Sequence, residues 1–384
     1  MSGIYIHIPF CRKACHYCDF HFSTQHQVID EMVEALDKEM VIRKHYLKTS
    51  KLDTVYFGGG TPSLLSEKQL ATIFETIHHE FQFSPDAEIT LESNPDDFTP
   101  ENVAMWKRLG INRLSIGIQS FREEDLQWMN RAHNAEQALR SIELAKSAGI
   151  ENITIDLIYG VPGLTDEAWL KNLEIAFRSG VNHLSCYSLT VESRTALAAM
   201  IRQKKVADVD DMQSSRQFRL LIEQAEANGF EHYEISNFAR DGKYSVHNTS
   251  YWKGAHYLGI GPSAHSFDGE SRQWNVYNNQ LYLKSMKENR VPFEREELTK
   301  KDKYNEYILT SLRTKWGIDL EVAKEKGGEI QVEKFSAITA KYVEEGIEPK
   351  RFGIYVDDRR EVDGGSDGGG VVLVSFFFSP KSQK

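Results

Sequence analysis

The chain has 384 residues, of which 40% are hydrophobic and 27% charged, and its formal net charge is −10. This length allows about two or three domains with a sizeable core, and the acidic balance disfavours a general nucleic-acid binder. No apolar run approaches the ~20 residues of a membrane-spanning helix, and the start does not resemble a secretory signal. Three of the four cysteines are clustered, which is a poor disulfide framework, so we expect a reducing, cytoplasmic location.

Strand-like and helix-like segments alternate along the first half of the chain. Short apolar runs predict six strands, at 4–8, 54–57, 88–92, 113–118, 152–160 and 183–189. The segments between them have helical patterns, and several begin with Ser, Thr or Asp and end at Gly. Such alternation predicts parallel strand–helix–strand units. We therefore expect an α/β fold with an open barrel of six β/α units over 1–205, and a doubly wound sheet is the alternative.

Polar or glycine-rich stretches follow five successive predicted strands. They are the cysteine stretch after the first strand and then GGGTP (58–62), ESNPD (92–96), QSF (119–121) and YGVPG (159–163). In a β/α barrel, the carboxyl ends of the strands build the site at one face. We therefore expect these five stretches to meet at one rim of the barrel.

The pattern changes after about residue 205. Residues 206–300 begin with a helical segment and continue with runs that look like strands and turns, YSVHNTSYW (244–252) among them, which predicts an α+β extension flanking the barrel. Residues 301–384 begin with helical patterns and predict a small helical domain. The tail is atypical after about residue 346, and residues 357–384 predict either a flexible linker with a docking strand or a disordered tail with an aggregation-prone segment.

The stretch FCRKACHYCDF (10–20) holds Cys11, Cys15 and Cys18. Four thiolates close a structural metal site, whereas three can leave one metal position open for chemistry. Three cysteines on one loop can bind three irons of a [4Fe–4S] cluster and leave the fourth iron free for a small molecule. A zinc site that adds His16 or His21 is one alternative, and free loop thiols are another.

CRKACHYC resembles the cluster motif of the radical S-adenosylmethionine (SAM) proteins, and GGGTP resembles the glycine motif that contacts SAM in that superfamily. Eight motifs together are similar to its coproporphyrinogen-dehydrogenase-like branch: YIHIPFC, YFGGGTP, ESNPD, IGIQSF, DLIYGVPG, YEISNFA, HNTSYW and GIGPSAHSF. The resemblance implies a radical SAM barrel, a [4Fe–4S] cluster on the three cysteines, and SAM on the fourth iron. It also implies a winged-helix-like third domain, from which the chain departs after about residue 346, through divergence or a shifted reading frame.

The resemblance assigns SAM contacts to nine residues. These are Tyr5, Tyr17, Gly59, Gly60, Thr61, Glu92, Gln119, Arg131 and Asp156. The two tyrosines would lie beside the cluster and SAM, the glycines and the threonine at the methionine end, and the arginine at the carboxylate. The glutamate and glutamine would bind other polar groups, and the aspartate would bind the ribose hydroxyls. The simpler interpretations are a strand-end acid that caps the next helix and a solvated surface arginine.

Two types of protein in this branch differ in function. One is the oxygen-independent coproporphyrinogen III dehydrogenase, a radical SAM oxidoreductase, and the other is the HemW-type heme chaperone, which binds heme and transfers it to acceptor proteins. The dehydrogenase carries a further cysteine two positions after the third ligand, and an extension before the cluster. Here Phe20 stands at that position and the cysteines begin at Cys11. Both features favour the chaperone type over an enzyme, and the dehydrogenase is the alternative.

HNTSYW resembles the His-Asn-x-x-Tyr-Trp pattern of the chaperone type. The resemblance implies that His247 is an axial ligand to heme iron and that Asn248, Tyr251 and Trp252 belong to the heme site. A structural histidine in a turn is the alternative, and His265 is a second candidate ligand.

We interpret His183 and Cys186 as packing residues on the sixth strand. The expected partners are heme and heme-acceptor proteins of respiration, some of them membrane-associated, and a homodimer is a further expectation. Nucleic acid and a transmembrane segment are not expected.

Overall fold

The computed structural model describes residues 1–333, 335 and 337. This part of the chain forms two compact units. The first comprises Met1–His232 and Ser236–Glu297, and the second comprises Tyr233–Ile235 and the described residues from Leu298 onward. The atypical tail after about residue 346 lies outside the described residues, and the division of the chain at 205 and 300 stays a prediction.

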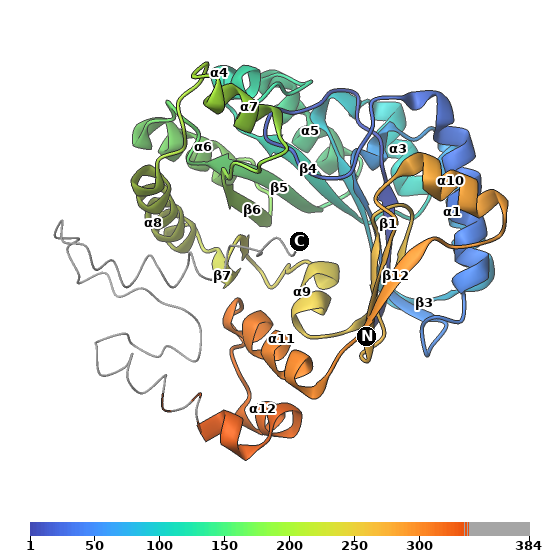
Figure 1. Ribbon diagram of the computed structural model, residues 1–384. Coiled ribbons are helices and arrows are strands. Elements are labelled where there is room, and N and C mark those ends of the chain that lie inside the picture. Colours follow the sequence, from blue (N-terminus) through green and yellow to red (C-terminus); the bar gives the residue numbers. More distant parts are fainter. Residues whose placement is uncertain (334, 336, 338–384) are drawn as a thin grey trace. The chain divides into compact units, whose positions relative to one another are not determined.

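Six parallel strands, each followed by at least one helix, form the open barrel that the sequence predicts (Figure 1). The strands are β1 (Ser2–Ile8), β2 (Lys51–Gly59), β3 (Gln82–Ser93), β4 (Arg113–Gln119), β5 (Asn152–Tyr159) and β6 (His183–Ser188). They pair in chain order, and every pairing is parallel. The predicted α/β class and the six-unit barrel are therefore confirmed.

The barrel helices are α1 (Ile29–Arg43), α2 (Glu67–Glu80), α3 (Pro100–Arg108), α4 (Glu123–Trp128), α5 (Ala135–Ser147) and α6 (Asp166–Arg178). Four of these six helices, α2, α3, α5 and α6, begin at a side-chain cap. Ser66 and Asn134 each form a capping box, and Thr99 and Thr165 each accept a backbone N–H of the first turn. The buried faces of these helices pack on the apolar residues of the strands and form the core.

Alternate residues of the strands face the inside of the barrel, and many of them are polar. Thr54 and Tyr56 on β2 and Glu88 and Glu92 on β3 contact other polar groups there. Val55, Ile89 and Leu91, which alternate with the inward residues, belong to the apolar core under the helices. Apolar side chains would fill such a barrel completely. The carboxylates and hydroxyls on this inner face instead suit a polar ligand.

Residues after α7 (Ala196–Arg202) and α8 (Asp211–Ala227) extend the same sheet at both edges. Here β8 (Asn237–Ala239) pairs antiparallel with β6, and β9 (His256–Ile260) pairs in parallel with β1. The remaining strands are β7 (Glu231–Glu234), β10 (His265–Phe267), β11 (Ser271–Asn275) and β12 (Phe293–Glu297), in the order β12-β11-β10-β9-β1-β2-β3-β4-β5-β6-β8-β7. Helix α10 (Asn279–Lys287) lies beside α1 (Figure 1).

Residues 246–252 form a helix, α9 (Val246–Trp252), where the sequence predicts strands and turns. The Ser245 hydroxyl accepts the N–H of Asn248 and caps the helix. The Glu88 carboxylate accepts the N–H groups of Val246 (3.0 Å) and His247 (2.9 Å). This carboxylate comes from β3, far away in sequence, so no local pattern shows that it satisfies the start of a helix.

A buried carboxylate on α1 joins that helix to the added strands. Glu39 accepts hydrogen bonds from Arg43 Nη1 (3.1 Å), the Gly261 N–H (2.8 Å), Asn275 Nδ2 (2.8 Å) and the Tyr282 hydroxyl (2.5 Å). All four side chains in this group are buried. The group fixes the extension to the barrel through one fully partnered charge.

The second unit contains α11 (Lys300–Leu312) and α12 (Leu320–Gly327), which confirms a helical part after residue 300. The sequence predicts helix from 303 through 320, but the chain turns between the two helices, where Gly317 has a φ of 64°. Within this unit Arg313 forms an ion pair with Glu234 (3.0 Å). Across the described residues, no helix has the length and apolar character to cross a membrane.

Candidate functional site

The three clustered cysteines lie on one loop, residues 9–23, which follows the carboxyl end of β1 and is called the cysteine loop below. The Cys11 N–H donates to the Ser23 carbonyl (3.0 Å) and the Ser23 N–H donates to the Pro9 carbonyl (2.9 Å). The Thr61 hydroxyl, at the end of β2, donates to Cys11 Sγ (3.4 Å). The cysteine loop is therefore closed at its base and rests on the rim, as the sequence predicts.

Residues after α4 hold the middle of the cysteine loop. The Asn130 side-chain amide donates to the Ala14 carbonyl (2.7 Å), and the His16 N–H donates to the Met129 carbonyl (3.1 Å). Both contacts flank Cys15. They fix the backbone on either side of this residue.

Residues after β11 hold the far end of the cysteine loop. The Tyr277 hydroxyl donates to the Asp19 carbonyl (3.2 Å), and His21 Nε2 forms a hydrogen bond with Asn279 Oδ1 (2.7 Å). The extension therefore contacts the cysteine loop directly.

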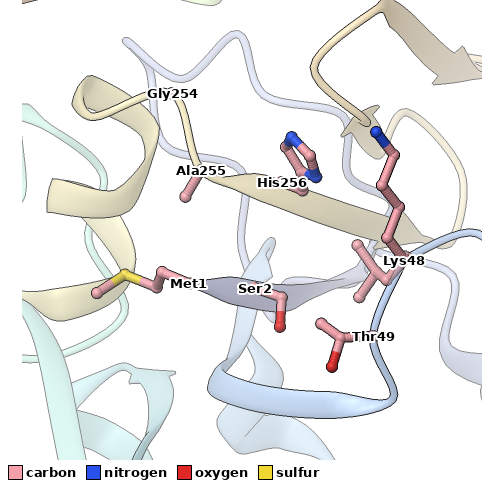
Figure 2. A pocket seen from close by; sticks show the side chains of 8 residues that line it. Met1, Ser2, Lys48, Thr49, Gly254, Ala255 and His256 are labelled. Carbon is pink, nitrogen blue, oxygen red and sulfur yellow. The ribbon is translucent and has the colours of Figure 1, made fainter.

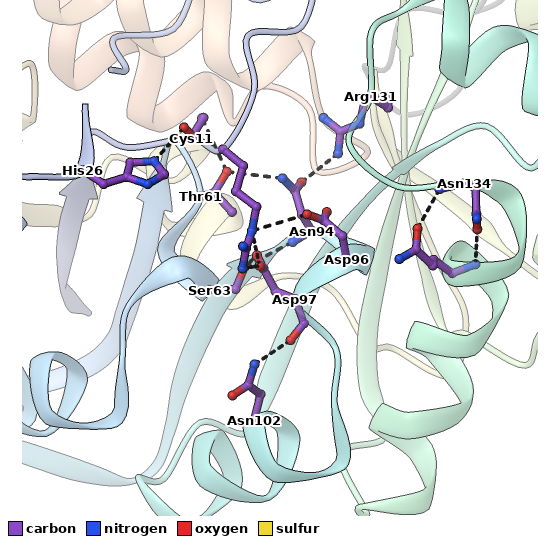
Figure 3. A network of polar contacts seen from close by, with 12 residues as sticks. Cys11, His26, Thr61, Ser63, Asn94, Asp96, Asp97, Asn102, Arg131 and Asn134 are labelled. Atoms are coloured by element: carbon purple, nitrogen blue, oxygen red, sulfur yellow. Dashed lines mark hydrogen bonds and ion pairs between the residues drawn. The ribbon is translucent and has the colours of Figure 1, made fainter. Parts of the chain in front are cut away.

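A polar network fastens the cysteine loop to the ends of β2 and β3 (Figure 3). The Asp97 carboxylate accepts Arg12 Nε (2.9 Å) and the Ser63 hydroxyl (2.6 Å). The Asn94 amide donates to the Thr61 hydroxyl (3.3 Å). Asp97, directly after the ESNPD motif, therefore holds the cysteine loop, and Asn94 of the motif binds the rim at Thr61.

Arg131 connects Cys15 to β4. Its Nη1 donates to Cys15 Sγ (3.3 Å), and its Nη2 donates to Asn94 Oδ1 (2.7 Å) and the Gly117 carbonyl (2.7 Å). In the part of the chain that the structure describes, its buried Nε has no partner, and neither has Asp96 Oδ1 nearby. The guanidinium thus contacts a thiol and keeps one donor available to a ligand.

Burial controls the protonation of two of the thiols. It raises the pKa of Cys11 to about 11, although the Thr61 hydroxyl lowers that pKa, and it raises the pKa of Cys18 to about 12. Both groups are therefore protonated near neutral pH, and a metal must displace these protons.

The zinc alternative needs a histidine beside the cysteines. His16 Nδ1 forms a hydrogen bond with the Trp128 carbonyl (2.8 Å), and His21 Nε2 is bound to Asn279. These bonds involve one nitrogen of each ring and do not exclude metal binding through the other. Among residues 1–333, 335 and 337, no group of three or more Cys, His, Asp or Glu side chains, the three cysteines included, is arranged to hold a metal ion, so this finding favours neither zinc nor a cluster. Cys186 is 1% exposed in the apolar core and does not add a fourth thiol. Three thiols leave one metal position open, and the unpartnered Arg131 Nε and Asp96 Oδ1 suit a ligand there, which fits a [4Fe–4S] cluster.

The glycines of GGGTP allow close contact with β1 and with the cysteine loop. Gly59 has a φ of 107°, and a Cβ there would lie 2.6 Å from the His7 ring. A Cβ on Gly60 would lie 2.5 Å from the Phe10 carbonyl, and the Gly60 N–H donates to the Ile8 carbonyl (2.9 Å). The sequence suggests that these glycines let the backbone approach a ligand. In the structure they let it approach β1 and the cysteine loop.

We expect Gly60→Ala to lower the free energy of unfolding by about 1–3 kcal/mol, because the new methyl group overlaps the backbone of Phe10. Iron content after anaerobic reconstitution should also fall, since Phe10 precedes Cys11. Urea unfolding and iron analysis measure the two effects. Gly242→Ala is the matched control, because a Cβ there meets nothing within 4 Å and imposes only backbone strain. Equal iron contents in the two variants would contradict the expectation.

Glu92 is the centre of the predicted SAM contacts. Its carboxylate accepts the Tyr56 hydroxyl (2.7 Å) and the Gly59 N–H (3.1 Å). Tyr5 stacks on Tyr56, with ring centroids 6.0 Å apart, and its hydroxyl is hydrogen-bonded to His7 Nδ1 (3.1 Å). These contacts place Tyr5, Gly59 and Glu92 together on the inner face of the barrel, toward the carboxyl ends of the strands.

The other predicted SAM residues adjoin this group. Gln119 ends β4 with a φ of 67°, a conformation that non-glycine residues rarely adopt and that is common at functional sites. Burial raises the pKa of Tyr17, and the neighbouring Arg131 charge opposes this. Burial, reinforced by the nearby Glu92, raises the pKa of Asp156 to about 7. The nine residues thus lie in one region beside the cysteines, and their contacts with SAM stay a prediction.

His247 lies deeper in the barrel, beside both Tyr56 and Tyr5, and its ring centroid is 6.5 Å from that of Tyr5. Its ring stacks on the Tyr56 ring, with centroids 4.9 Å apart and planes at 25°. Its Nδ1 is hydrogen-bonded to Thr54 Oγ1 (2.7 Å) and its Nε2 to the Tyr251 hydroxyl (2.7 Å). Burial lowers the pKa of His247 to about 3, so the ring is neutral. It is 1% exposed, and both ring nitrogens have protein partners.

The remaining candidates differ in exposure. Asn248 and Trp252 are half-buried on α9, and His265 is exposed on β10. His183 and Cys186 are buried, as expected of packing residues. The heme assignment of α9 stays a prediction.

Sequence reasoning missed Thr54, Tyr56, Glu88 and Arg113. The first three contact His247 or its backbone. The buried Arg113 lies near Glu88, with Nε 3.7 Å from a carboxylate oxygen. A period-two alternation of polar and apolar residues on β2 and β3 is the signal that could have found the first three.

A surface pocket of about 360 Å³ lies at the amino end of β1 (Figure 2). It is lined by Met1, Ser2, Leu47, Lys48, Thr49, Gly254, Ala255 and His256. The cysteines follow the other end of this strand, so the pocket is separate from the candidate site.

Comparisons with known proteins agree with this geometry. The family model of the Radical SAM superfamily matches residues 5–176. The chain is 34% identical over 350 residues to the heme chaperone HemW of Bacillus subtilis, covering 90% of this chain and 92% of that protein. It is 35% identical over 323 residues to the heme chaperone HemW of Mycobacterium tuberculosis, covering 83% of each chain.

A solved structure also has this fold. Coproporphyrinogen III oxidase (HemN) from Escherichia coli matches with a TM-score of 0.79 and 24% identity, over 90% of this chain and 84% of that one. This likeness concerns the fold alone. With a radical SAM match in the barrel and extensive identity to HemW proteins, the chain belongs to the HemW family of the radical SAM superfamily.

Proposed function

We propose that this protein is a heme chaperone that carries a SAM-binding [4Fe–4S] cluster and transfers heme to acceptor proteins. The observation that carries the proposal is the 34% identity to the heme chaperone HemW of Bacillus subtilis over 90% of the chain. Phe20, at the position of the further cysteine of the dehydrogenase type, supports it. The likeness to HemN extends to the fold and favours no second function.

In this proposal Cys11, Cys15 and Cys18 bind the cluster. The cluster supplies one iron for SAM and an electron for SAM chemistry. The chain's own donors stabilise the ligating sulfurs, because Thr61 donates to the Cys11 sulfur and Arg131 donates to that of Cys15. These contacts also orient the cysteine loop toward the inner face of the barrel.

SAM would then lie between the cysteine loop and the inner face of the barrel at the carboxyl ends of the strands. Glu92 and Asp156 would accept its donors, Gln119 would bind a further polar group, and the unpartnered Arg131 Nε would face the carboxylate. Tyr5, Tyr17, Gly59, Gly60 and Thr61 would complete the site.

We expect SAM affinity to rise between about pH 6 and pH 8 and the rise to be lost in Asp156→Asn. Burial and Glu92 raise the pKa of Asp156 to about 7, whereas Arg113, Ser185 and Arg131 oppose the shift. The carboxyl is therefore protonated below this pKa and ionised above it, where it accepts hydroxyls and attracts the sulfonium. The change is up to about tenfold, following the ionised fraction.

Equilibrium binding of SAM to the reconstituted protein at several pH values measures this effect. Asp241→Asn, an exposed position, is the control and should keep the pH dependence. An unchanged slope in Asp156→Asn would show that another group titrates.

Heme would use Nε2 of His247, with Asn248, Tyr251 and Trp252 around it. In the structure the Tyr251 hydroxyl is hydrogen-bonded to His247 Nε2, so this hydroxyl must move before Nε2 can bind iron. Neutral imidazole is a good iron ligand, and burial keeps His247 neutral.

A hemin titration followed by optical absorption tests the function. Saturable binding by the wild type is expected, with affinity at least about tenfold lower in His247→Ala, since an axial ligand is lost. His265→Ala, the second candidate, is the matched control and should bind as the wild type does. A coproporphyrinogen assay on the same sample should give no decarboxylated product. Such a product would instead identify a dehydrogenase.

We further propose that the acceptors are respiratory proteins, some of them membrane-associated, and that the protein acts in the cytoplasm. A homodimer is part of this proposal, and sedimentation with and without the cluster tests it.

A further inference from the structure

We propose that Tyr56 is a positioning residue between the SAM site and His247, and that through it SAM and heme bind antagonistically. The inference rests on the proposed function, in which Glu92 contacts SAM and His247 ligates heme iron.

Tyr56 contacts both proposed ligand sites at once. Its hydroxyl donates to Glu92 Oε1 (2.7 Å), and its ring stacks on the His247 ring at 4.9 Å. The side chain is 7% exposed, and the Tyr5 ring also stacks on it, with the planes at 23°. Because Tyr56 is packed in this way, its hydroxyl position and its ring position cannot change independently.

The structure shows His247 in a shielded arrangement. Thr54 and Tyr251 bind its two ring nitrogens, and Glu88 binds the backbone N–H. Iron needs a free ring nitrogen, so the Tyr251 hydroxyl must move away from Nε2. A porphyrin also needs space beside the ring, and His247 is 1% exposed, so in this proposal ligation shifts His247 away from Tyr56. Tyr56 then loses one stacking partner, so its side chain is less constrained and its hydrogen bond to Glu92 is weaker.

SAM acts on the other end of the same side chain. Burial raises the pKa of Glu92, and a bound sulfonium cation favours the ionised carboxylate. An ionised carboxylate accepts a stronger hydrogen bond from the Tyr56 hydroxyl than a neutral one does. SAM therefore stabilises Tyr56 in the position that shields His247. Linkage makes the effect reciprocal, so heme must weaken SAM binding by the same factor.

The test is a hemin titration of the anaerobically reconstituted protein with and without saturating SAM. No reductant is added, so that SAM stays intact, and SAM binding is measured separately by equilibrium dialysis. For the wild type we expect SAM to raise the apparent Kd for hemin by about 5-fold to 150-fold, the usual range of coupling between sites. In Tyr56→Phe, which keeps the stacked ring and removes the bond to Glu92, the ratio should approach one. Tyr159→Phe, a buried tyrosine on β5, is the control and should keep the wild-type ratio.

The outcomes separate the two proposals. Saturable hemin binding that SAM leaves unchanged or strengthens, with SAM shown to be bound, would overturn the coupling and leave the chaperone function standing. A Tyr56→Phe ratio equal to that of the wild type would overturn the role of Tyr56. Absence of saturable hemin binding to the wild type without SAM would overturn the proposed function and the coupling with it.

Discussion

Cys15→Ala is expected to abolish the iron–sulfur cluster, so that iron and sulfide fall from about four of each per chain to near zero after reconstitution. The reason is the donor set, because the cysteine loop supplies three thiols and each would bind a different iron. Loss of one ligand leaves a second iron without a cysteine. Some heme binding should remain, since His247 lies on α9 and not on the cysteine loop.

The matched control is Cys186→Ala. Cys186 is 1% exposed on β6 and belongs to the apolar core, so its removal should leave the iron content and the cluster absorption unchanged. Iron and sulfide analysis with visible absorption measures both variants. An intact cluster spectrum in Cys15→Ala would refute the ligand assignment.

Glu39→Gln is expected to lower the free energy of unfolding by about 3–5 kcal/mol. The carboxylate accepts four hydrogen bonds in a buried group, and one donor is the Arg43 guanidinium. An amide keeps the size but brings its own donors to a place where donors already converge. Arg43 is then left buried without its countercharge.

The control is a Glu–Arg ion pair with the same spacing on the protein surface. Glu174 and Arg178 form an ion pair with the same four-residue spacing on α6, and their side chains are 53% and 80% exposed. Glu174→Gln should change the free energy of unfolding by about 0.5 kcal/mol or less. Urea unfolding curves measure both variants, and similar losses in the two would show that burial does not decide the effect.

The barrel and its rim could be predicted from the sequence because their signals are local. Apolar runs of four to nine residues alternate with capped helical segments, and the six strands lie where these runs predict them. The cysteine stretch follows β1, and GGGTP and ESNPD begin within the last two residues of β2 and β3. Parallel strands place such stretches at one edge, so their convergence needed no knowledge of side-chain contacts.

The sequence by itself therefore determined where the strands end. The tertiary structure decided which contacts the side chains at those ends make. The glycines of GGGTP indicate that the backbone lies close to another group. Only the structure shows that this group is His7 for Gly59 and Phe10 for Gly60. The family resemblance assigns Arg131 to the SAM carboxylate, but only the fold places it against the Cys15 sulfur.

The segment HNTSYW shows the same division most clearly. Its residue pattern is visible in the sequence, but its helix begins on a carboxylate from β3 and its histidine is enclosed by β2. These contacts join residues more than 150 positions apart. Local propensity carries no information about such partners, because burial and hydrogen bonding between distant segments exist only once the barrel has formed.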